Sequence, residues 1–374
     1  MADSGSKAQP SPSIQPAPAA PVPRARPASS GPKRILCLDA GGPRAVLQLG
    51  ILGALEARLK ARSFLPDFRL CDYFDLFAGV STGAYFAAEL ARGRRVADIE
   101  VAFAQMAPDM IASRNPAALD TALSGLFGNA PLFGPPWRSR FATFLKRRSD
   151  GAVLFVTDRS PPEPGALLHR VLIAATAAPA KLDSEKVTLT PDGGATPFVD
   201  ATAAGLADPS LALFRALAAQ EGGLNWALGP DRVLIVSVGS GRRSQAVGKW
   251  AVADALAQDA AAASAEMLRG LSEGARRAHD SGVRYAHLPM LRYERIDAVI
   301  GPDTISAMAA DADSASSVLR ELGAEAVQTM LGQSHGMERA MFPKAFNPPG
   351  FGKRPLGPPK IRLEALGRTF RRKD

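Results

Sequence analysis

Short apolar runs alternate with stretches of helical periodicity over the first quarter of the chain. Residues 34–39 and 73–78 form compact apolar runs, which predict buried strands. Each run is followed by a segment whose apolar residues recur at helical spacing, at 45–61 and at 84–92. This order of strand, helix, strand and helix predicts an α/β fold with a parallel sheet that helices cover on both faces.

The rest of the chain is less regular, and its elements are predicted one by one. Further strands are expected at 152–157, 198–200 and 232–239, the last being the clearest apolar run of the sequence. Further helices are expected at 96–110, 138–147, 167–178, 211–219, 251–278 and 315–331.

Composition divides the chain into three parts. Residues 1–33 are mostly Pro, Ala and Ser with few large apolar side chains. Such a segment buries too little surface to offset the entropy of ordering, so we expect it to be disordered. We expect one catalytic domain over 34–340 and a basic tail rich in Pro and Gly over 341–374.

The net charge of +9 comes from the two ends of the chain. Residues 1–34 carry five Lys or Arg against one acid, and 344–374 carry nine against two, which leaves the folded part close to neutral. A near-neutral core argues against nucleic acid as a partner. Basic tails favour peripheral contact with an anionic membrane surface, although a solvated tail without a partner has the same composition.

Few residues of the sequence suit a metal or a disulfide framework. Cys37 and Cys71 both lie in apolar runs, and the four histidines show no metal-ligand spacing, so no metal or other cofactor is expected.

No stretch approaches the roughly 18 consecutive apolar residues of a membrane span. The N-terminus lacks the apolar core of a secretory signal. These features predict a cytoplasmic protein that contacts membranes peripherally.

A candidate nucleophile stands between the second predicted strand and its helix. The sequence Gly79-Val80-Ser81-Thr82-Gly83 has the form G-x-S-x-G of a nucleophile elbow. A serine on such a turn projects above the sheet, and the helix that follows offers unpaired N–H groups to developing negative charge. The pentapeptide alone also fits an ordinary strand-to-helix turn, so other motifs must decide.

A glycine-bearing turn follows the first predicted strand, with the sequence Asp39-Ala40-Gly41-Gly42-Pro43-Arg44. The N–H groups of Gly41 and Gly42 are candidate oxyanion donors, and Arg44 could fix the loop or attract an anionic head group. A plain connection is the simplest alternative. A dinucleotide loop would need G-x-G-x-x-G, and the phosphate loop of an actin-like sugar kinase would leave the elbow serine unexplained.

Taken together, these motifs resemble those of the patatin-like phospholipase family. The family's D-G-G-G-x-R-G is matched at 39–45 by Asp, two Gly and Arg, and its G-x-S-x-G is matched at 79–83. Its A-T-S-A-A-P, D-G-G/A with A-D-P, and S-L-G-T-G motifs are similar to 174–179, 200–209 and 237–241. Five motifs in the family's order imply a three-layer α/β/α patatin-like fold with a mostly parallel central sheet. The resemblance also implies a lipid acyl hydrolase with a Ser–Asp dyad.

An aspartate is a chemically reasonable base here, because no histidine falls in a motif. A carboxylate at the end of a buried strand can accept the serine proton if burial raises its pKa. Asp200 follows the strand-like Phe198-Val199 and precedes A-D-P at the family's interval, so it is preferred. Asp192 is the rival, since Asp192-Gly193-Gly194 resembles the family's D-G-G locally, but it follows Pro191 and is typical of a turn.

The sequence departs from the family's pattern at three glycines. Ala40, Ala45 and Ala201 stand where the family has Gly. Alanine resists positive φ, so a loop that required positive φ at these positions would be misshapen.

The leading hypothesis is a serine lipid acyl hydrolase that acts on a lipid or phospholipid. Ser81 would be the nucleophile and Asp200 the base, with Gly41, Gly42 and Arg44 at the oxyanion loop. One alternative is a degenerate family member that binds lipid or a protein partner without turnover. Another is a Ser-His-Asp esterase that uses one of the four histidines, which are His169, His279, His287 and His335.

Overall fold

The computed structural model describes most of the predicted domain. The described residues are 31–112, 116–134, 137–177, 187–190, 196–243, 273–284, 290–301, 303–304, 312–332, 347 and 351. Nearly all of the predicted end segments, 1–33 and 341–374, and most of the predicted helix 251–278 lie outside these residues. Phe351, within the predicted tail, packs its ring against Tyr73 and Phe68, with ring centroids 5.4 and 6.3 Å apart.

Nine strands and seven labelled helices make up the described part of the chain. The strands are β1 (Lys33–Leu38), β2 (Leu76–Gly79), β3 (Arg140–Arg147), β4 (Val153–Thr157), β5 (Phe198–Asp200), β6 (Val233–Val238), β7 (Arg242–Arg243), β8 (Arg292–Ile296) and β9 (Val299–Ile300). The helices are α1 (Ala45–Ser63), α2 (Thr82–Ala91), α3 (Val96–Ala112), α4 (Pro116–Phe127), α5 (Leu168–Thr176), α6 (Ser210–Ala218) and α10 (Ala312–Gly332). Residues 273–284 are also helical. Short 3₁₀ turns are η1 (Gly42–Arg44), η2 (Leu70–Asp72) and η4 (Ala201–Ala204).

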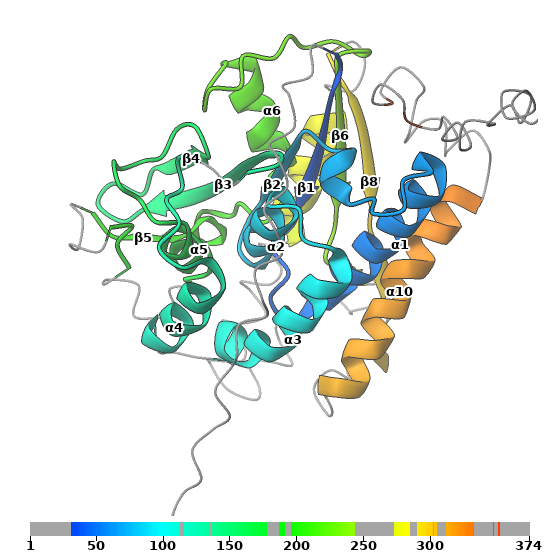
Figure 1. Cartoon of the computed structure of the whole chain (residues 1–374), viewed down its shortest axis with the longest axis horizontal. Helices are drawn as coiled ribbons and strands as arrows, with labels where there is room; N and C mark the ends of the chain where they lie inside the picture. Colours follow the sequence, from blue (N-terminus) through cyan, green and yellow to red (C-terminus); the bar gives the residue numbers. More distant parts are fainter. Residues whose placement is uncertain are drawn as a thin grey trace, which may run out of the picture.

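A seven-stranded sheet forms the centre of the molecule (Figure 1). Its order is β4-β3-β2-β1-β6-β8, and β5 pairs with β3 beside this path. The pairs β3–β2, β2–β1, β1–β6 and β6–β8 are parallel, whereas β4 and β5 run antiparallel to β3. The predicted α/β fold with a mostly parallel central sheet is confirmed.

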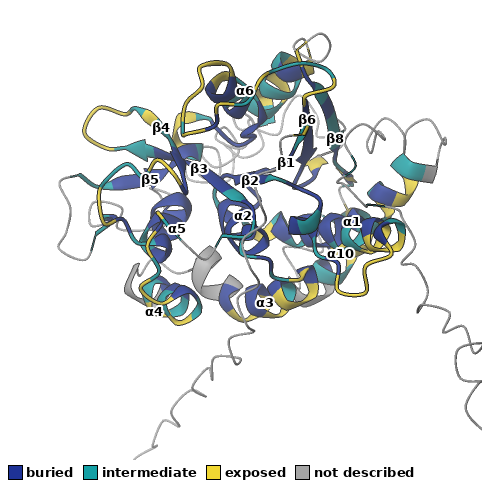
Figure 2. Ribbon diagram, turned by 45° about the horizontal axis from the view of Figure 1, so that its top comes forward, coloured by how far each residue is buried: buried dark blue, intermediate teal, exposed yellow. Residues whose placement is uncertain are grey.

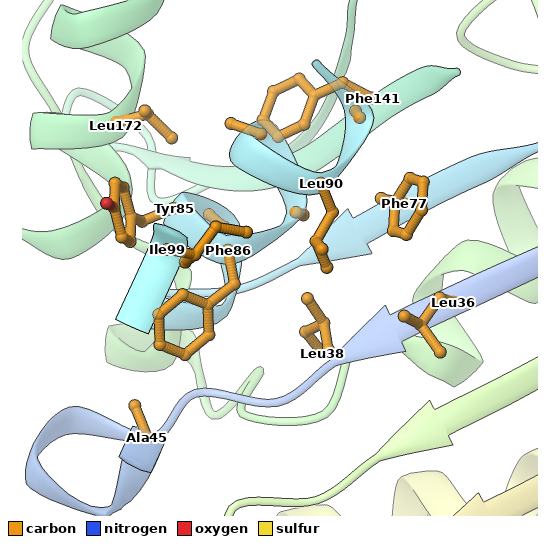
Figure 3. Close-up of a cluster of buried hydrophobic side chains, with 14 of the residues drawn as sticks. Leu36, Leu38, Ala45, Phe77, Tyr85, Phe86, Leu90, Ile99, Phe141 and Leu172 are labelled. Atoms are coloured by element: carbon orange, nitrogen blue, oxygen red, sulfur yellow. The ribbon is translucent and has the colours of Figure 1, made fainter. Parts of the chain in front are cut away.

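Each face of the sheet packs against its own helices, because neighbouring strand residues point to opposite faces. Leu36 and Leu38 face a core shared with α1, α2, α5 and α10, whereas Ile35 and Cys37 face α6. Figure 3 shows Leu90 of α2 turned toward Leu38 and the neighbouring strands. Figure 2 shows the same layering as buried strands enclosed by helices with exposed outer sides. Among the described helices, none combines the length and apolar content needed to cross a bilayer.

One predicted element is wrong: within the helix predicted at 138–147, Arg140–Arg147 form strand β3. Phe141, Ala142, Phe144 and Leu145 are spaced as on a helical face, but all four are buried because β3 is covered on both sides. Thr143, the polar residue that interrupts the apolar run, is buried as well and donates its hydroxyl to the Gly79 carbonyl at 2.9 Å.

Other differences are smaller. The strand predicted at 73–78 begins only at Leu76, after the 3₁₀ turn Leu70–Asp72. Helix α4 and the strands β7, β8 and β9 were not predicted.

Helices α1 and α10 lie side by side in Figure 1 and touch through two glycines. A Cβ on Gly50 of α1 would overlap the Arg320 carbonyl of α10, and a Cβ on Gly323 of α10 would overlap the Leu47 carbonyl of α1. The two backbones can therefore approach this closely only because neither position carries a side chain.

We predict opposite effects for two Gly→Ala substitutions within α1. Gly50→Ala should lower the free energy of unfolding by about 1–3 kcal/mol, because the methyl group forces the helices apart. Gly53→Ala should raise it by about 0.5–1 kcal/mol, since its Cβ meets nothing closer than 4.0 Å and alanine favours the helix. Urea unfolding of both variants measures the difference, and a stabilising Gly50→Ala would contradict the observed packing.

Candidate active site

Ser81 sits on a strained turn between β2 and α2. Its φ of 57° and ψ of −130° lie outside the regions that non-glycine residues favour. Such strain persists only where surrounding structure imposes it, and it is common at catalytic residues. Helix α2 begins at the next residue, Thr82.

Two glycines flank Ser81 because the elbow packs directly against backbone. A Cβ on Gly79 would overlap the carbonyl group of Gly83. A Cβ on Gly83 would lie 2.6 Å from the carbonyl oxygens of both Leu38 and Asp39. Gly79 is therefore required by the tightness of the elbow itself, and Gly83 by the contact between the elbow and the end of β1.

Strand β3 brings Asp200 to Ser81. Gly79 at the end of β2 pairs with Thr143 of β3, and Asp200 at the end of β5 pairs with Leu145. Strand β4 occupies the other edge of β3 over these residues, so β2 and β5 share one edge. Because β2 runs parallel and β5 antiparallel to β3, their carboxyl ends point toward each other.

The carboxylate of Asp200 is buried and surrounded by neutral groups. The hydroxyls of Ser81 and Thr202 lie close enough to its side chain to lower its pKa, and its Oδ1 accepts from the Thr202 N–H at 2.8 Å. Its backbone N–H donates to the Ala177 carbonyl at 3.2 Å, which connects it to the small-residue motif at 174–179. Burial raises the pKa of Asp200 to about 6, and the hydrogen bonds from Thr202 and Ser81 oppose the rise.

The N–H groups of Gly41 and Gly42 converge on a single oxygen. Each donates to Oγ1 of Thr82 at 3.1 Å. An oxyanion site requires two N–H donors that point at one oxygen. In this structure that oxygen is the hydroxyl of Thr82 and not an atom of a substrate. Thr82 was not singled out by the sequence, although it occupies the variable position after Ser81.

The three alanines that replace family glycines do not distort this loop. Among the described residues, positive φ occurs outside glycine only at Phe64, Ser81 and Gln220, so Ala40, Ala45 and Ala201 are free of that strain. Within the loop, Gly42 has a φ of 53°, and glycine adopts positive φ without steric cost because it has no Cβ.

Arg44 supports the loop rather than pointing away from it. Its Nη1 donates to the Gly241 carbonyl at 3.2 Å and lies 3.9 Å from a carboxylate oxygen of Glu273. Gly241 ends the S-V-G-S-G motif at 237–241, so this arginine joins two of the motifs found in the sequence.

A buried ion cluster lies beneath the glycine loop. Arg295 of β8 donates to Asp39 at 2.7 Å, to Asp208 at 3.0 Å and to Asp297 at 3.1 Å. Its Nη1 also donates to Ser237 Oγ at 2.8 Å. Burial raises the pKa of Asp39 to about 7, and the Arg295 charge opposes the rise. Asp39 and Asp208 belong to motifs noted in the sequence, but Arg295 lies on a strand that was not predicted.

The described histidines are engaged away from Ser81. His169 Nδ1 lies 3.0 Å from the Gly128 carbonyl, and His279 Nδ1 lies 3.0 Å from the Asp208 carbonyl. Asp192, His287 and His335 lie outside the described residues. Within the part that is described, no three His, Cys, Asp or Glu side chains are arranged to hold a metal ion.

Comparison with known proteins identifies the domain. Residues 36–204 match the family model for patatin-like phospholipase, a range that contains the glycine loop, Ser81 and Asp200. This matched stretch, a little under half of the chain, is similar to patatin-like phospholipases. The resemblance noted in the sequence is thereby confirmed.

Curated relatives match over short segments. A cGAMP-activated phospholipase of Escherichia coli is 35% identical over 81 residues, which are 22% of this chain and 23% of that protein. Patatin-like protein 1 of Oryza sativa is 49% identical over 57 residues, 15% of this chain and 14% of the relative. A probable inactive patatin-like protein 9 of Arabidopsis thaliana is 28% identical over 138 residues, 36% of this chain and 35% of the relative. The matches thus span about a quarter of the first relative's length, and about a third of the last.

We predict that Asp200→Asn stabilises the protein at alkaline pH. Its folded pKa of about 6 exceeds the ordinary 3.8, so the folded state binds more protons and stability falls as pH rises from about 4 to about 6. The asparagine removes this effect and should raise the free energy of unfolding at pH 8 by about 1–3 kcal/mol, with a smaller gain at pH 4. Thermal or urea unfolding at both pH values measures it.

Asp158→Asn is the matched control. Asp158 is also buried, but it is held by Arg140 at 2.8 Å. Loss of one partner of that pair should destabilise the protein at both pH values. An Asp200→Asn variant that is less stable than wild type at pH 8 would contradict the prediction.

Proposed function

We propose that this chain is a serine lipid acyl hydrolase that cleaves an ester bond of a lipid or phospholipid. The observation that carries the proposal is the contact between the strained Ser81 and Asp200, a buried carboxylate with a pKa of about 6. The match of residues 36–204 to the patatin-like phospholipase model supports a lipid ester as substrate. Relatives named as phospholipases support a phospholipid in particular.

In the proposed acylation step, the Ser81 oxygen attacks the ester carbonyl carbon while its proton passes to Asp200. The negative charge that develops on the carbonyl oxygen is stabilised by the N–H groups of Gly41 and Gly42. Collapse of this intermediate breaks the ester bond and leaves an acyl group on Ser81. The departing alkoxide takes the proton from Asp200 and leaves as an alcohol.

Deacylation repeats the same steps with water. Asp200, again ionised, accepts a proton from the water that attacks the acyl carbon. The oxyanion returns to the same two N–H groups, the bond to Ser81 breaks, and the serine oxygen recovers the proton from Asp200. A fatty acid is released, and the residues return to their starting protonation states.

In the proposed cycle, the Thr82 hydroxyl must move away from the N–H groups of Gly41 and Gly42. Its hydroxyl accepts both loop N–H groups in the substrate-free protein. In the proposal, rotation about its Cα–Cβ bond withdraws the oxygen when the substrate carbonyl arrives. The hydroxyl therefore holds the two donors in a converging arrangement until they are needed.

A second candidate function is lipid binding without turnover. The Thr82 hydroxyl at the loop N–H groups favours it, because an oxygen that did not withdraw would exclude the oxyanion. One relative is named a probable inactive patatin-like protein, which supports the absence of turnover in this alternative. Vesicle binding without release of fatty acid would distinguish this function from hydrolysis.

We also propose peripheral contact with anionic membranes. The Lys and Arg residues at both ends of the chain support it, since they give each end an excess of positive charge. A Ser-His-Asp triad has less support, because His169 and His279 bond backbone carbonyls elsewhere.

We predict that Ser81→Ala abolishes both covalent labelling by a fluorophosphonate and release of fatty acid from phospholipid vesicles. The serine oxygen is the only protein atom that acts as a nucleophile in the proposed mechanism. Thr82→Ser, which keeps a hydroxyl at the neighbouring position, serves as a control and should still be labelled. Equal labelling of wild type and Ser81→Ala would overturn the proposal, and an unlabelled wild type that binds vesicles would favour the second candidate.

A further prediction concerns the base and its pH dependence. Only ionised Asp200 accepts a proton, so kcat/KM should rise with pH through about 6 and become constant above about pH 7. Asp200→Asn should lower kcat by about 10²–10⁴-fold, whereas Asp192→Asn should change it little. Hydrolysis of a soluble short-chain ester between pH 4.5 and 9 measures both. A larger loss in Asp192→Asn would assign the base to that residue instead.

A further inference from the structure

The peptide unit between Ala40 and Gly41 has a polar group on each side. A trans peptide is planar, so its C=O and its N–H point in opposite directions. Here the N–H is the Gly41 donor directed at Thr82 Oγ1, and the C=O is that of Ala40. Any contact that fixes the Ala40 carbonyl therefore also fixes the direction of the Gly41 N–H.

Two side chains hold the Ala40 carbonyl from the side opposite Thr82. Ser240 Oγ donates to it at 2.8 Å, and Arg276 Nη2 donates to it at 2.7 Å. Ser240 is 1% exposed, so its hydroxyl has little access to water as an alternative partner. The Ala40 N–H donates to the Ala207 carbonyl at 2.9 Å, which anchors the residue at its other end.

Arg276 is itself held in place by the ion cluster. Its Nε lies 3.7 Å from Oδ2 of Asp39, and its side chain is only 13% exposed. The same helical segment, 273–284, carries His279 against the Asp208 carbonyl and Glu273 beside Arg44. The Arg276 guanidinium thus comes from a helical segment that contacts the site through Glu273, Arg276 and His279.

We infer that Ser240 and Arg276 are positioning residues that aim the Gly41 N–H at the substrate oxyanion by holding the Ala40 carbonyl. The inference rests on the proposed function, because that function is what assigns the Gly41 N–H to the oxyanion. Neither side chain touches the reacting atoms in this assignment. Ser240 belongs to the S-V-G-S-G motif. The inference gives its hydroxyl the role of orienting the Gly41 N–H.

This role predicts a separation of kinetic constants that simple structural support does not. The oxyanion develops in the transition state and is absent from the bound ester, so a misdirected donor lowers kcat and leaves KM nearly unchanged. Removal of a whole oxyanion donor costs about 10²–10³-fold in kcat. Ser240→Ala leaves the donor present but less well aimed, so we expect kcat to fall about 10–100-fold with KM within about twofold of wild type.

Matched variants separate this effect from loss of stability. Ser139 is another buried serine, and its hydroxyl donates to the carbonyls of Cys71 and Phe74, away from the loop. Ser139→Ala should lower stability comparably while kcat remains within about twofold. Ser240→Thr keeps a hydroxyl, and threonine stands there in the family motif, so it should retain kcat within about threefold.

Arg276→Met tests the second contact and also serves if Ser240→Ala does not fold. It removes the bond to the Ala40 carbonyl, and we expect the same fall in kcat with little change in KM. Arg277→Met is its control on the next residue, because Arg277 is 67% exposed and its ion-pair partner in the described part of the chain is Glu273, at 3.9 Å.

Hydrogen exchange provides a readout that does not require turnover. We expect the amides of Gly41 and Gly42 to exchange at least about tenfold faster in Ser240→Ala and Arg276→Met than in wild type. They should be unchanged in Ser139→Ala and Arg277→Met. Mass spectrometry of peptides that contain the loop measures this rate in the full-length protein.

The outcomes are distinguishable. Faster exchange together with a fall in kcat supports the inference. Unchanged exchange, or a kcat equal to that of wild type despite faster exchange, overturns it. If wild type hydrolyses no lipid while exchange still accelerates in both variants, the proposed function fails, but the two side chains are shown to hold the peptide.

Discussion

One buried guanidinium holds the carboxyl ends of the central strands together. Arg295 bonds Asp39 after β1, Ser237 within β6 and Asp297 after β8, and it reaches Asp208 before α6. Asp39 and Asp208 are fully buried, so loss of the arginine would remove the ion-pair partner of Asp208 and leave Asp39 with Arg276, 3.7 Å away. Loss of one partner from a buried ion pair typically costs about 3–5 kcal/mol.

Each of these carboxylates also organises the loop next to it. Asp208 accepts from the backbone N–H and the hydroxyl of Ser210, which starts α6. Asp297 accepts from the Gly241 N–H at 2.9 Å, and Gly241 in turn accepts from Arg44. The position of the glycine loop relative to the elbow is therefore set by electrostatics as much as by apolar packing.

Asp200 contrasts with this cluster in its choice of partners. The cluster carboxylates are opposed by arginines, whereas Asp200 has hydroxyl and N–H groups around it. Burial raises the pKa of both kinds of carboxylate, of Asp39 to about 7 and of Asp200 to about 6. Of the two, Asp200 is the one whose side chain lies beside the Ser81 hydroxyl, as a proposed base near neutral pH requires.

Much of the fold could be predicted because fully buried parallel strands leave continuous apolar runs. The runs ending at Leu38 and Val238 are of this kind. Strand β3 could not be recognised in the same way, because the polar Thr143 interrupts its apolar run. The hydroxyl of Thr143 donates to the Gly79 carbonyl, which comes close only when the chain folds. Strand β8 was missed because Arg292, Glu294 and Arg295 make it look like a surface segment.

The candidate site was predicted as far as its motifs extend. Ser81 and Asp200 each follow an apolar run that ends at a turn, which is a local signal in the sequence. The roles of Thr82, Ser240 and Arg276 depend on contacts between distant segments, and no local pattern reports such contacts. The effect of the three alanines also depended on backbone angles, which sequence does not state.

The shortness of β5 gives the two proposed catalytic residues different local stability. Ser81 follows a strand in the middle of the sheet, whereas Asp200 ends a strand of three residues paired only to the last part of β3. Short segments at the margin of a sheet open more readily than the elements they dock against. In the proposed mechanism, detachment of β5 would leave the elbow folded but separate Ser81 from its proposed base, so activity would be lost without global unfolding.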